Sequence, residues 1–126
     1  MIFDRNENEP VIALLGAGAM GTAIVKRFAA GKKVLLGDVN LQNLEHAVEA
    51  FRRQGYNAEG FQVDALDRAQ VRAFAQKAAS MGPVKYFVDT AGASPNQASP
   101  EFIVALDLVA TAVAIDEFAR VIALGG

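Results

Sequence analysis

The sequence contains no cysteine and a single histidine, His46, among its 126 residues. Without cysteine there is no disulfide framework, no thiolate nucleophile and no cysteine-based metal site. A lone histidine has no second imidazole or thiolate with which to share a metal ion, so we interpret His46 as a surface residue of a helix. The sequence therefore predicts no metal site, and the lack of cysteine fits the reducing cytoplasm, where we expect the protein to reside.

Clusters of basic residues are also lacking, because 12 lysines and arginines are set against 14 acidic residues, for a formal net charge of −2. Nucleic-acid-binding proteins normally gather lysine and arginine on one face, so no nucleic-acid partner is expected. Residues 1–10 are rich in acidic groups, where a secretion signal needs a basic start and an apolar stretch. No membrane association is expected either, because charges interrupt the apolar region at residues 102–124, which we interpret as a buried helix; they are Asp107, Asp116, Glu117 and Arg120.

Hydrophobic residues make up 52% of the chain and charged residues 21%, which is typical of a globular protein. The length suits one domain over residues 1–126, with residues 1–10 as a flexible N-terminus. Strands are predicted at residues 11–15, 34–38, 58–63 and 86–88, and helices at residues 22–30, 41–54, 67–81 and 100–122. This alternation predicts an α/β fold with a doubly wound, Rossmann-type parallel sheet flanked by helices, in the strand order 3-2-1-4.

The first predicted helix has an apolar face and a polar face. Ile24, Val25 and Phe28 are expected to face the sheet, while Lys26 and Arg27 are expected to face solvent.

The strongest motif is Gly16-Ala17-Gly18-Ala19-Met20-Gly21, which lies between the first predicted strand and the first predicted helix. Gly16 permits a tight turn, Gly18 leaves room for a pyrophosphate, and Gly21 lets the helix pack close to the strand. Amides at the start of the helix would then face the phosphates of a dinucleotide, and Met20 is expected to pack beside the loop. The alternative is that these glycines only make a compact turn.

Asp38, followed by Val39, closes the second predicted strand about 20 residues after this motif. A carboxylate there accepts hydrogen bonds from both hydroxyls of an adenosine ribose and repels a 2′-phosphate, which favours NAD over NADP. Lys32 and Lys33 precede the strand and keep NADP as the lesser alternative. Asp38 also stands where it could cap the helix that begins near Leu41, and both roles can coexist.

Two further segments are expected at the same edge of the sheet. Asp64 or the Asp64-Ala65 backbone would meet the adenine amino group, while Asp67 is expected to cap the third helix. The alternative is that one of these two acids is a cap with no role in ligand binding. After the fourth strand, the small residues Thr90, Ala91 and Gly92 would let the backbone approach the second ribose, the alternative being an ordinary exit from a strand.

Together these residues resemble the amino-terminal half of the short-chain dehydrogenases/reductases over nearly the whole chain. The family usually has TGxxxGxG in the glycine loop and NNAG after the fourth strand, whereas this chain has GxGxxG and Asp89-Thr90-Ala91-Gly92. Asp107 stands where a classical member has asparagine. The resemblance implies a divergent member that binds NAD and takes part in hydride transfer between a nicotinamide cofactor and a carbonyl or alcohol substrate.

The family's catalytic serine and Tyr-x-x-x-Lys pair would follow Gly126, so the resemblance implies a chain truncated before the fifth strand. The two tyrosines, Tyr56 and Tyr86, have no lysine four residues later. No catalytic residue is therefore assigned, and a small-molecule substrate is expected only if a second half completes the protein. The alternative is a non-catalytic NAD-binding regulatory or interaction module.

The last predicted helix carries apolar residues on nearly all sides over residues 102–114, more than one sheet face can cover. In the family the corresponding helix often packs against its copy in a partner subunit. The resemblance thus implies a homo-oligomer that associates through this helix.

Overall fold

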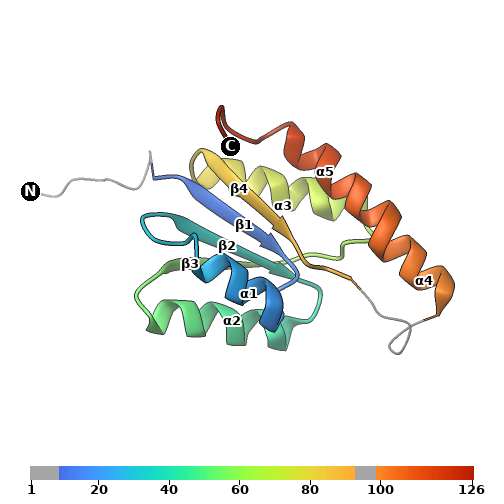
Figure 1. The fold of residues 1–126 in the computed structure, drawn as a ribbon, viewed down its shortest axis with the longest axis horizontal. Helices are drawn as coiled ribbons and strands as arrows, with labels where there is room; N and C mark the ends of the chain where they lie inside the picture. Colours follow the sequence, from blue (N-terminus) through green and yellow to red (C-terminus); the bar gives the residue numbers. More distant parts are fainter. Residues whose placement is uncertain (1–8, 93–98) are drawn as a thin grey trace, which may run out of the picture.

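The computed structural model describes residues 9–92 and 99–126. Its four parallel strands form one sheet in the order β3-β2-β1-β4 (Figure 1). The strands are β1 (Val11–Leu15), β2 (Lys33–Asp38), β3 (Asn57–Gln62) and β4 (Val84–Asp89). The predicted doubly wound α/β fold and its strand order are confirmed. The flexible N-terminus predicted for residues 1–10 falls almost wholly outside the described residues.

Helices cover both faces of the sheet (Figure 1). α1 (Ala19–Lys26) and α2 (Leu41–Arg53) lie on one face. α3 (Arg68–Met81) lies on the other face, together with a C-terminal helical segment. That segment consists of α4 (Pro100–Val104), the π-helical η1 (Ala105–Ala110) and α5 (Thr111–Ala119).

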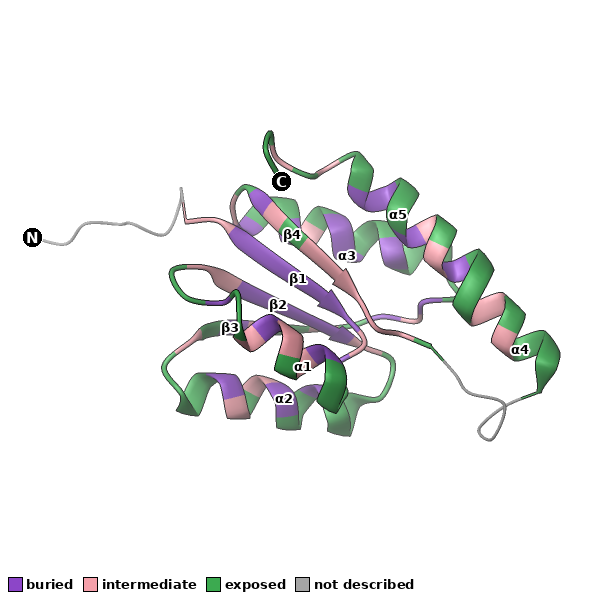
Figure 2. Cartoon of the chain, in the orientation of Figure 1, coloured by how far each residue is buried: buried purple, intermediate pink, exposed green. Residues whose placement is uncertain are grey.

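β1 supplies the centre of two hydrophobic cores. Val11, Ala13 and Leu15 pack with the residues of α3 and α5, whereas Ile12 and Leu14 pack with those of α1 and α2. All five residues are buried, because alternate side chains of a strand point to opposite faces and both faces are covered (Figure 2). This explains why the first strand is a continuous apolar run rather than an alternating one.

The strand register brings the candidate site residues to one edge of the sheet. Leu15 at the end of β1 pairs with Gly37 in β2 and with Asp89 in β4. The carboxyl ends of the central strands are therefore level, and the segments that leave them start side by side.

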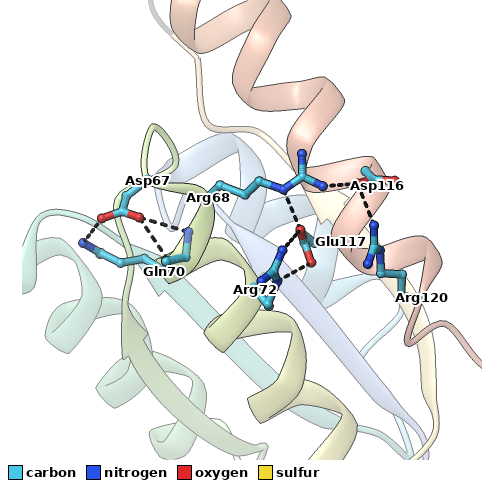
Figure 3. Close-up of polar contacts among 8 residues, drawn as sticks. Asp67, Arg68, Gln70, Arg72, Asp116, Glu117 and Arg120 are labelled. Atoms are coloured by element: carbon cyan, nitrogen blue, oxygen red, sulfur yellow. Dashed lines mark hydrogen bonds and ion pairs between the residues drawn. The ribbon is translucent and has the colours of Figure 1, made fainter.

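Side-chain caps begin three of the helices. Asp67 accepts hydrogen bonds from the Ala69 and Gln70 amides at the start of α3, and Figure 3 shows its contacts with Gln70. Ser99 accepts from the Phe102 amide before α4. The predicted cap at Asp67 is confirmed. At α2, however, the cap is Asn40 and not Asp38, because Asn40 is the residue directly before the first turn.

The first helix differs from its predicted range of residues 22–30. α1 begins at Ala19, directly after Gly18, and ends at Lys26 because the Arg27 and Phe28 amides bond to carbonyls three residues back and tighten the last turn. Phe28 contacts the ring of Tyr86 in β4, with ring centroids 5.6 Å apart, but it stays 46% exposed and is not buried under the helix. Lys26 is half-buried, with its ammonium 5.5 Å from the centre of the Phe51 ring, and does not simply face solvent.

The last helix also differs from its predicted range of residues 100–122. α5 ends at Ala119, and Ile122 instead pairs in parallel with Val84 at the start of β4. The Ala123 amide donates to the Val84 carbonyl at 2.8 Å. The free edge of β4 thus provides hydrogen-bond partners for the backbone that follows α5.

α5 and α3 are joined by a network of ion pairs (Figure 3). Glu117 of α5 is only 2% exposed, and it accepts from Arg68 Nε at 2.8 Å and from Arg72 Nε at 3.2 Å. Asp116, its neighbour, pairs with Arg68 and with Arg120. Hydrogen bonds from Arg72 and Arg68 hold the pKa of Glu117 below its ordinary value. The network explains how an acidic residue is tolerated in an apolar segment.

The C-terminal helical segment leaves apolar side chains uncovered, as the sequence predicts. Val104 is 54% exposed, Leu108 67%, Val109 57% and Ile115 60%. Within the described residues, no helix is long and apolar enough to cross a membrane.

Candidate functional site

The glycine loop is held against the exit from β4 by close backbone contacts. Gly16 has a φ of +99°, and a Cβ added to it would lie 2.7 Å from the Ala91 nitrogen. A Cβ on Gly21 would lie 2.6 Å from the Gly16 carbonyl oxygen and would also press on the Thr90 hydroxyl. Both positions therefore require glycine, for the turn and for close helix packing.

Gly18 is different, because a Cβ added there would meet no described atom within 4 Å. Gly18 is the residue before α1, and no side chain of the described residues caps that helix. The first amides of α1 thus remain available to an anion, and a side chain at residue 18 would stand in its way. Met20, expected to pack beside the loop, is 72% exposed because it lies on the outer side of the first turn.

Asp38 links the end of β2 to the glycine loop. Its Oδ2 accepts a hydrogen bond from the Ala17 amide at 2.9 Å, and its Oδ1 accepts from the Asn40 amide at 2.9 Å. Each carboxylate oxygen keeps a further lone pair for a ligand hydroxyl. Val39, which follows, is 59% exposed and lies next to this carboxylate in the chain.

Lys32 and Lys33, which kept NADP as an alternative cofactor, lie at the opposite end of β2 from Asp38. Lys33 donates to the Met81 carbonyl, and Lys32 lies 5.5 Å from the centre of the Tyr86 ring. Neither position is near the acid at the carboxyl end of the strand.

Asp64 and Ala65 form a turn between β3 and α3. Asp64 Oδ1 accepts from the Leu66 amide, and the Asp64 amide donates to Gln70 Oε1, each at 2.9 Å. Ala65 is 9% exposed and packs in the core on the α3 face. As predicted, Asp67 is the cap of α3 and Asp64 is not.

The exit from β4 is fastened to the glycine loop through Thr90. Its amide donates to the Leu15 carbonyl and its hydroxyl donates to the Gly16 carbonyl, both at 2.9 Å. The sequence suggests Thr90 as a site residue only because it is small. It does not predict the bond from the Thr90 hydroxyl to Gly16, since the two residues are 74 positions apart. Asp89 accepts from the Ala91 amide at 3.0 Å, and burial raises the pKa of its carboxyl group.

Gly92 lies against Asp107 in η1, since a Cβ on Gly92 would be 3.1 Å from Asp107 Oδ1. The π-helical turn places this carboxylate beside the segment that leaves β4, and such turns often occur at functional sites. The sequence pattern predicts a regular helix at Asp107 and does not indicate a π-helical turn there. Ala93, the next residue, is outside the described part of the chain.

The fold therefore brings four segments to one edge: the glycine loop, Asp38 with Val39, the Asp64-Ala65 turn and residues 90–92. The central ones are joined directly by the bonds of Asp38 and Thr90 to the glycine loop. The arrangement offers helix amides for an anion and a carboxylate for hydroxyl groups. Across the described residues, no three histidine or acidic side chains cluster so as to hold a metal ion.

Comparisons with known proteins show what this chain is similar to. A family model described as short chain dehydrogenase matches residues 10–118. The short-chain dehydrogenase/reductase bsc3 of Alternaria brassicicola is 36% identical over 119 residues, which cover 94% of this chain and 43% of that protein. The chain thus spans less than half the length of this relative.

Solved structures match the fold. A short chain dehydrogenase/reductase from Burkholderia phymatum, in complex with NAD, aligns with a TM-score of 0.72 and 22% identity over 96% of this chain and 46% of that one. Actinorhodin polyketide ketoreductase, crystallised with NADPH, aligns with a TM-score of 0.78 and 18% identity over 90% of this chain and 47% of that one. At these identities the structures support the fold alone, and they were solved with different nicotinamide cofactors.

Proposed function

Because this chain belongs to the short-chain dehydrogenase family, we propose that it is the NAD-binding portion of an oxidoreductase that transfers hydride between a nicotinamide cofactor and a carbonyl or alcohol substrate. The observation that carries the proposal is the hydrogen bond from the Ala17 amide of the glycine loop to Asp38 at the end of β2. This bond holds the start of α1 close to the Asp38 carboxylate, which supports a role for the helix amides in binding a pyrophosphate and for the carboxylate in binding a ribose.

The residues present fit the cofactor. The amides at the start of α1 would bind the pyrophosphate, with the open space at Gly18 leaving room for it. Asp38 would accept from the adenosine ribose, the Asp64-Ala65 turn would border the adenine, and residues 90–92 would lie beside the second ribose. Bound nicotinamide supplies the hydride chemistry; these side chains bind and orient it.

We propose NAD rather than NADP, and Asp38 is the reason. A carboxylate held in place by two amides would stand next to the ribose and would repel a 2′-phosphate. Lys32 and Lys33 lie at the other end of β2 and would not offset it.

Hydride transfer to a carbonyl also needs a group that supplies a proton. In the 126 residues, Tyr56 and Tyr86 both lack a lysine four positions later. We therefore propose that the family's catalytic serine, tyrosine and lysine belong to a second half of the protein outside these residues. We also propose that the protein is cytoplasmic. We further propose that the uncovered apolar side chains of the C-terminal helical segment associate with a second copy.

A second candidate function is a non-catalytic NAD-binding regulatory or interaction module. The departures from the family pattern favour it, since Asp89 and Asp107 replace two asparagines. A gene that continues beyond Gly126 into a Tyr-x-x-x-Lys motif would argue against this candidate.

Titration with NADH, followed by its fluorescence, tests the binding proposal. Asp38→Ala should weaken binding about tenfold or more, because a charge-assisted contact to the ribose is lost. Glu59→Ala removes the same charge on β3, away from the loop, and should leave the affinity unchanged. The proposal would be wrong if the natural sequence did not bind NADH, or if the two variants bound NADH with equal affinity.

A further inference from the structure

A groove of about 370 Å³ lies between α2 and β3, the outer strand on one side of the sheet. Figure 1 shows β3 at this edge with α2 beside it. The residues of α2 that line the groove recur at intervals of three and four, so they form one stripe of the helix. They are Leu41, Leu44, Glu45, Val48, Glu49 and Arg52, and β3 contributes Gly60 and Gln62.

The floor of this α2–β3 groove is apolar, and Gly60 lies at its centre. A Cβ added to Gly60 would lie 2.9 Å from Val48 Cγ2 and 3.2 Å from Leu44 Cγ. Leu44 is 4% exposed and Val48 is half-buried. These distances bring two turns of α2 directly over one point of β3, so the lining residues of the helix and the strand meet there.

Hydrogen bonds between side chains and backbone mark both ends of the groove. At one end Arg52 Nε donates to the Ala58 carbonyl at 2.9 Å, and at the other Gln62 Nε2 donates to the Val39 carbonyl at 3.1 Å. Gly60 lies between these two bonds and is exposed. The groove therefore has a defined length along the edge strand.

Alternate residues of β3 direct their backbone groups away from the sheet. The Val63 amide donates to a carbonyl of β2 at 3.1 Å. Because every second residue of a parallel strand faces a given neighbour, Gly60 and Gln62 direct their N–H and C=O groups to the opposite side. The Ala58 carbonyl, which accepts from Arg52, lies on that side as the alternation requires. β3 is outermost in the described sheet, so these groups can pair with an added strand.

Acidic side chains form the rim of the groove. Glu45 follows Leu44 and Glu49 follows Val48, so both carboxylates belong to the turns of α2 that lie over β3. Residues four apart are neighbours on a helix surface. Glu49 pairs with Arg53 at 3.9 Å, but both side chains are more than half exposed, so this pair is weak. Glu45 forms no ion pair within residues 9–92 and 99–126.

We propose that the α2–β3 groove binds an extended segment of a partner protein, which adds to β3 as an outer strand and places a lysine or arginine in the groove. Backbone bonds to Gly60 and Gln62 hold the segment, and alternate side chains of the added strand face α2. The methylene stem of the basic side chain packs on the apolar floor, while its charged end reaches the acidic rim. A groove between a helix and a free strand edge thus recognises both an extended backbone and a positive charge.

NMR titration of the full chain at constant ionic strength tests the proposal. The probe is an acetylated and amidated hexapeptide of alternating lysine and valine, and the same peptide with glutamate in place of lysine is its control. The lysine peptide should shift the amides of residues 41–52 and 58–62 to saturation. It should also protect the amides of Gly60 and Gln62 from hydrogen exchange. The glutamate peptide should do neither.

Two variants separate the contribution of charge from that of the strand edge. Glu45→Gln should weaken binding of the lysine peptide by up to roughly fivefold, the effect of one ionic contact at an exposed site. Gln62→Pro removes an outward N–H and should weaken binding about fivefold. It should still fold, because proline is tolerated where the N–H of an edge strand faces away from the sheet. Glu101→Gln neutralises an exposed glutamate of α4 and is the matched control.

The proposal would be overturned if both peptides bound equally, or if the amides of residues 58–62 did not respond. It would also be overturned if Glu45→Gln and Gln62→Pro bound the lysine peptide as well as Glu101→Gln does. Shifts of the same amides on dilution of the chain without peptide would show that a second copy occupies this edge, and would likewise reject a partner segment.

Discussion

Gly18 and Gly21 are three residues apart in the glycine motif, the first directly before α1 and the second within it, and a methyl group would meet different surroundings at each. At residue 21 it would press on the Gly16 carbonyl and on Thr90, whereas at residue 18 it would enter open space. Glycine is thus needed for packing at one position and for access by a ligand at the other.

We expect Gly21→Ala to lower the free energy of unfolding by about 1–2 kcal/mol, because overpacking outweighs the gain in helix propensity. Gly18→Ala should change it by no more than about 0.5 kcal/mol and should still weaken NADH binding. Urea denaturation and NADH titration of both variants measure these effects. A Gly21→Ala protein as stable as the natural one, or a Gly18→Ala protein with full affinity, would show that the roles are misassigned.

The site residues differ in how far they could be predicted. Asp38 and the glycines follow from spacing along the chain, because β1, the loop and β2 are consecutive. The Thr90 hydroxyl bond to Gly16 depends on two distant strands becoming neighbours, and no local pattern encodes it. The alternative role of Asp38 as the cap of α2 was wrong, because the local pattern does not distinguish Asp38 from Asn40, two residues later.

At the scale of elements, the bounds of β1, α2 and α3 could be predicted to within one residue, because glycine, proline and capping side chains mark their ends. The C-terminal helical segment was harder. It contains a π-helical turn that no local pattern predicts, and it ends early because Ile122 pairs with Val84 of β4, a contact that outweighs helix propensity. The burial of Glu117 could not be predicted from the sequence either, because its partners Arg68 and Arg72 lie on α3, more than 40 residues away.

Glu117 should stabilise the contact between α3 and α5 in a pH-dependent way. Its pKa is lowered in the folded protein, so its stabilising effect is complete above the ordinary glutamate value of about 4.3 and is lost as the pH falls through the lowered value. Glu117→Gln should therefore be less stable than the natural protein at pH 7 and should approach it under strongly acidic conditions.

Thermal unfolding between pH 2 and pH 7 tests this expectation, with Asp116→Asn as the control. Asp116 is about half exposed and shares Arg68, so its neutralisation should cost less than that of Glu117. A constant difference between Glu117→Gln and the natural protein across the pH range would mean that packing, and not charge, joins the two helices.

At the scale of the whole molecule, several exposed apolar side chains gather on the C-terminal helical segment, whereas others, such as Met20 and Val39, are exposed elsewhere. Leu108, Val109 and Ile115 are each more than half exposed, on the face of that segment away from the core. Exposed apolar residues gathered in this way are typical of a protein–protein interface.

We expect sedimentation equilibrium to detect a dimer or a higher oligomer of the natural chain at micromolar concentration. The double variant Leu108→Glu with Ile115→Glu should be monomeric, because carboxylates at the centre of an apolar interface would lose their hydration without gaining partners. Leu66→Glu changes an exposed leucine in the loop before α3 and should leave association unchanged. If the natural chain is monomeric with and without NADH, these side chains do not join two copies, and the exposed face requires a different partner.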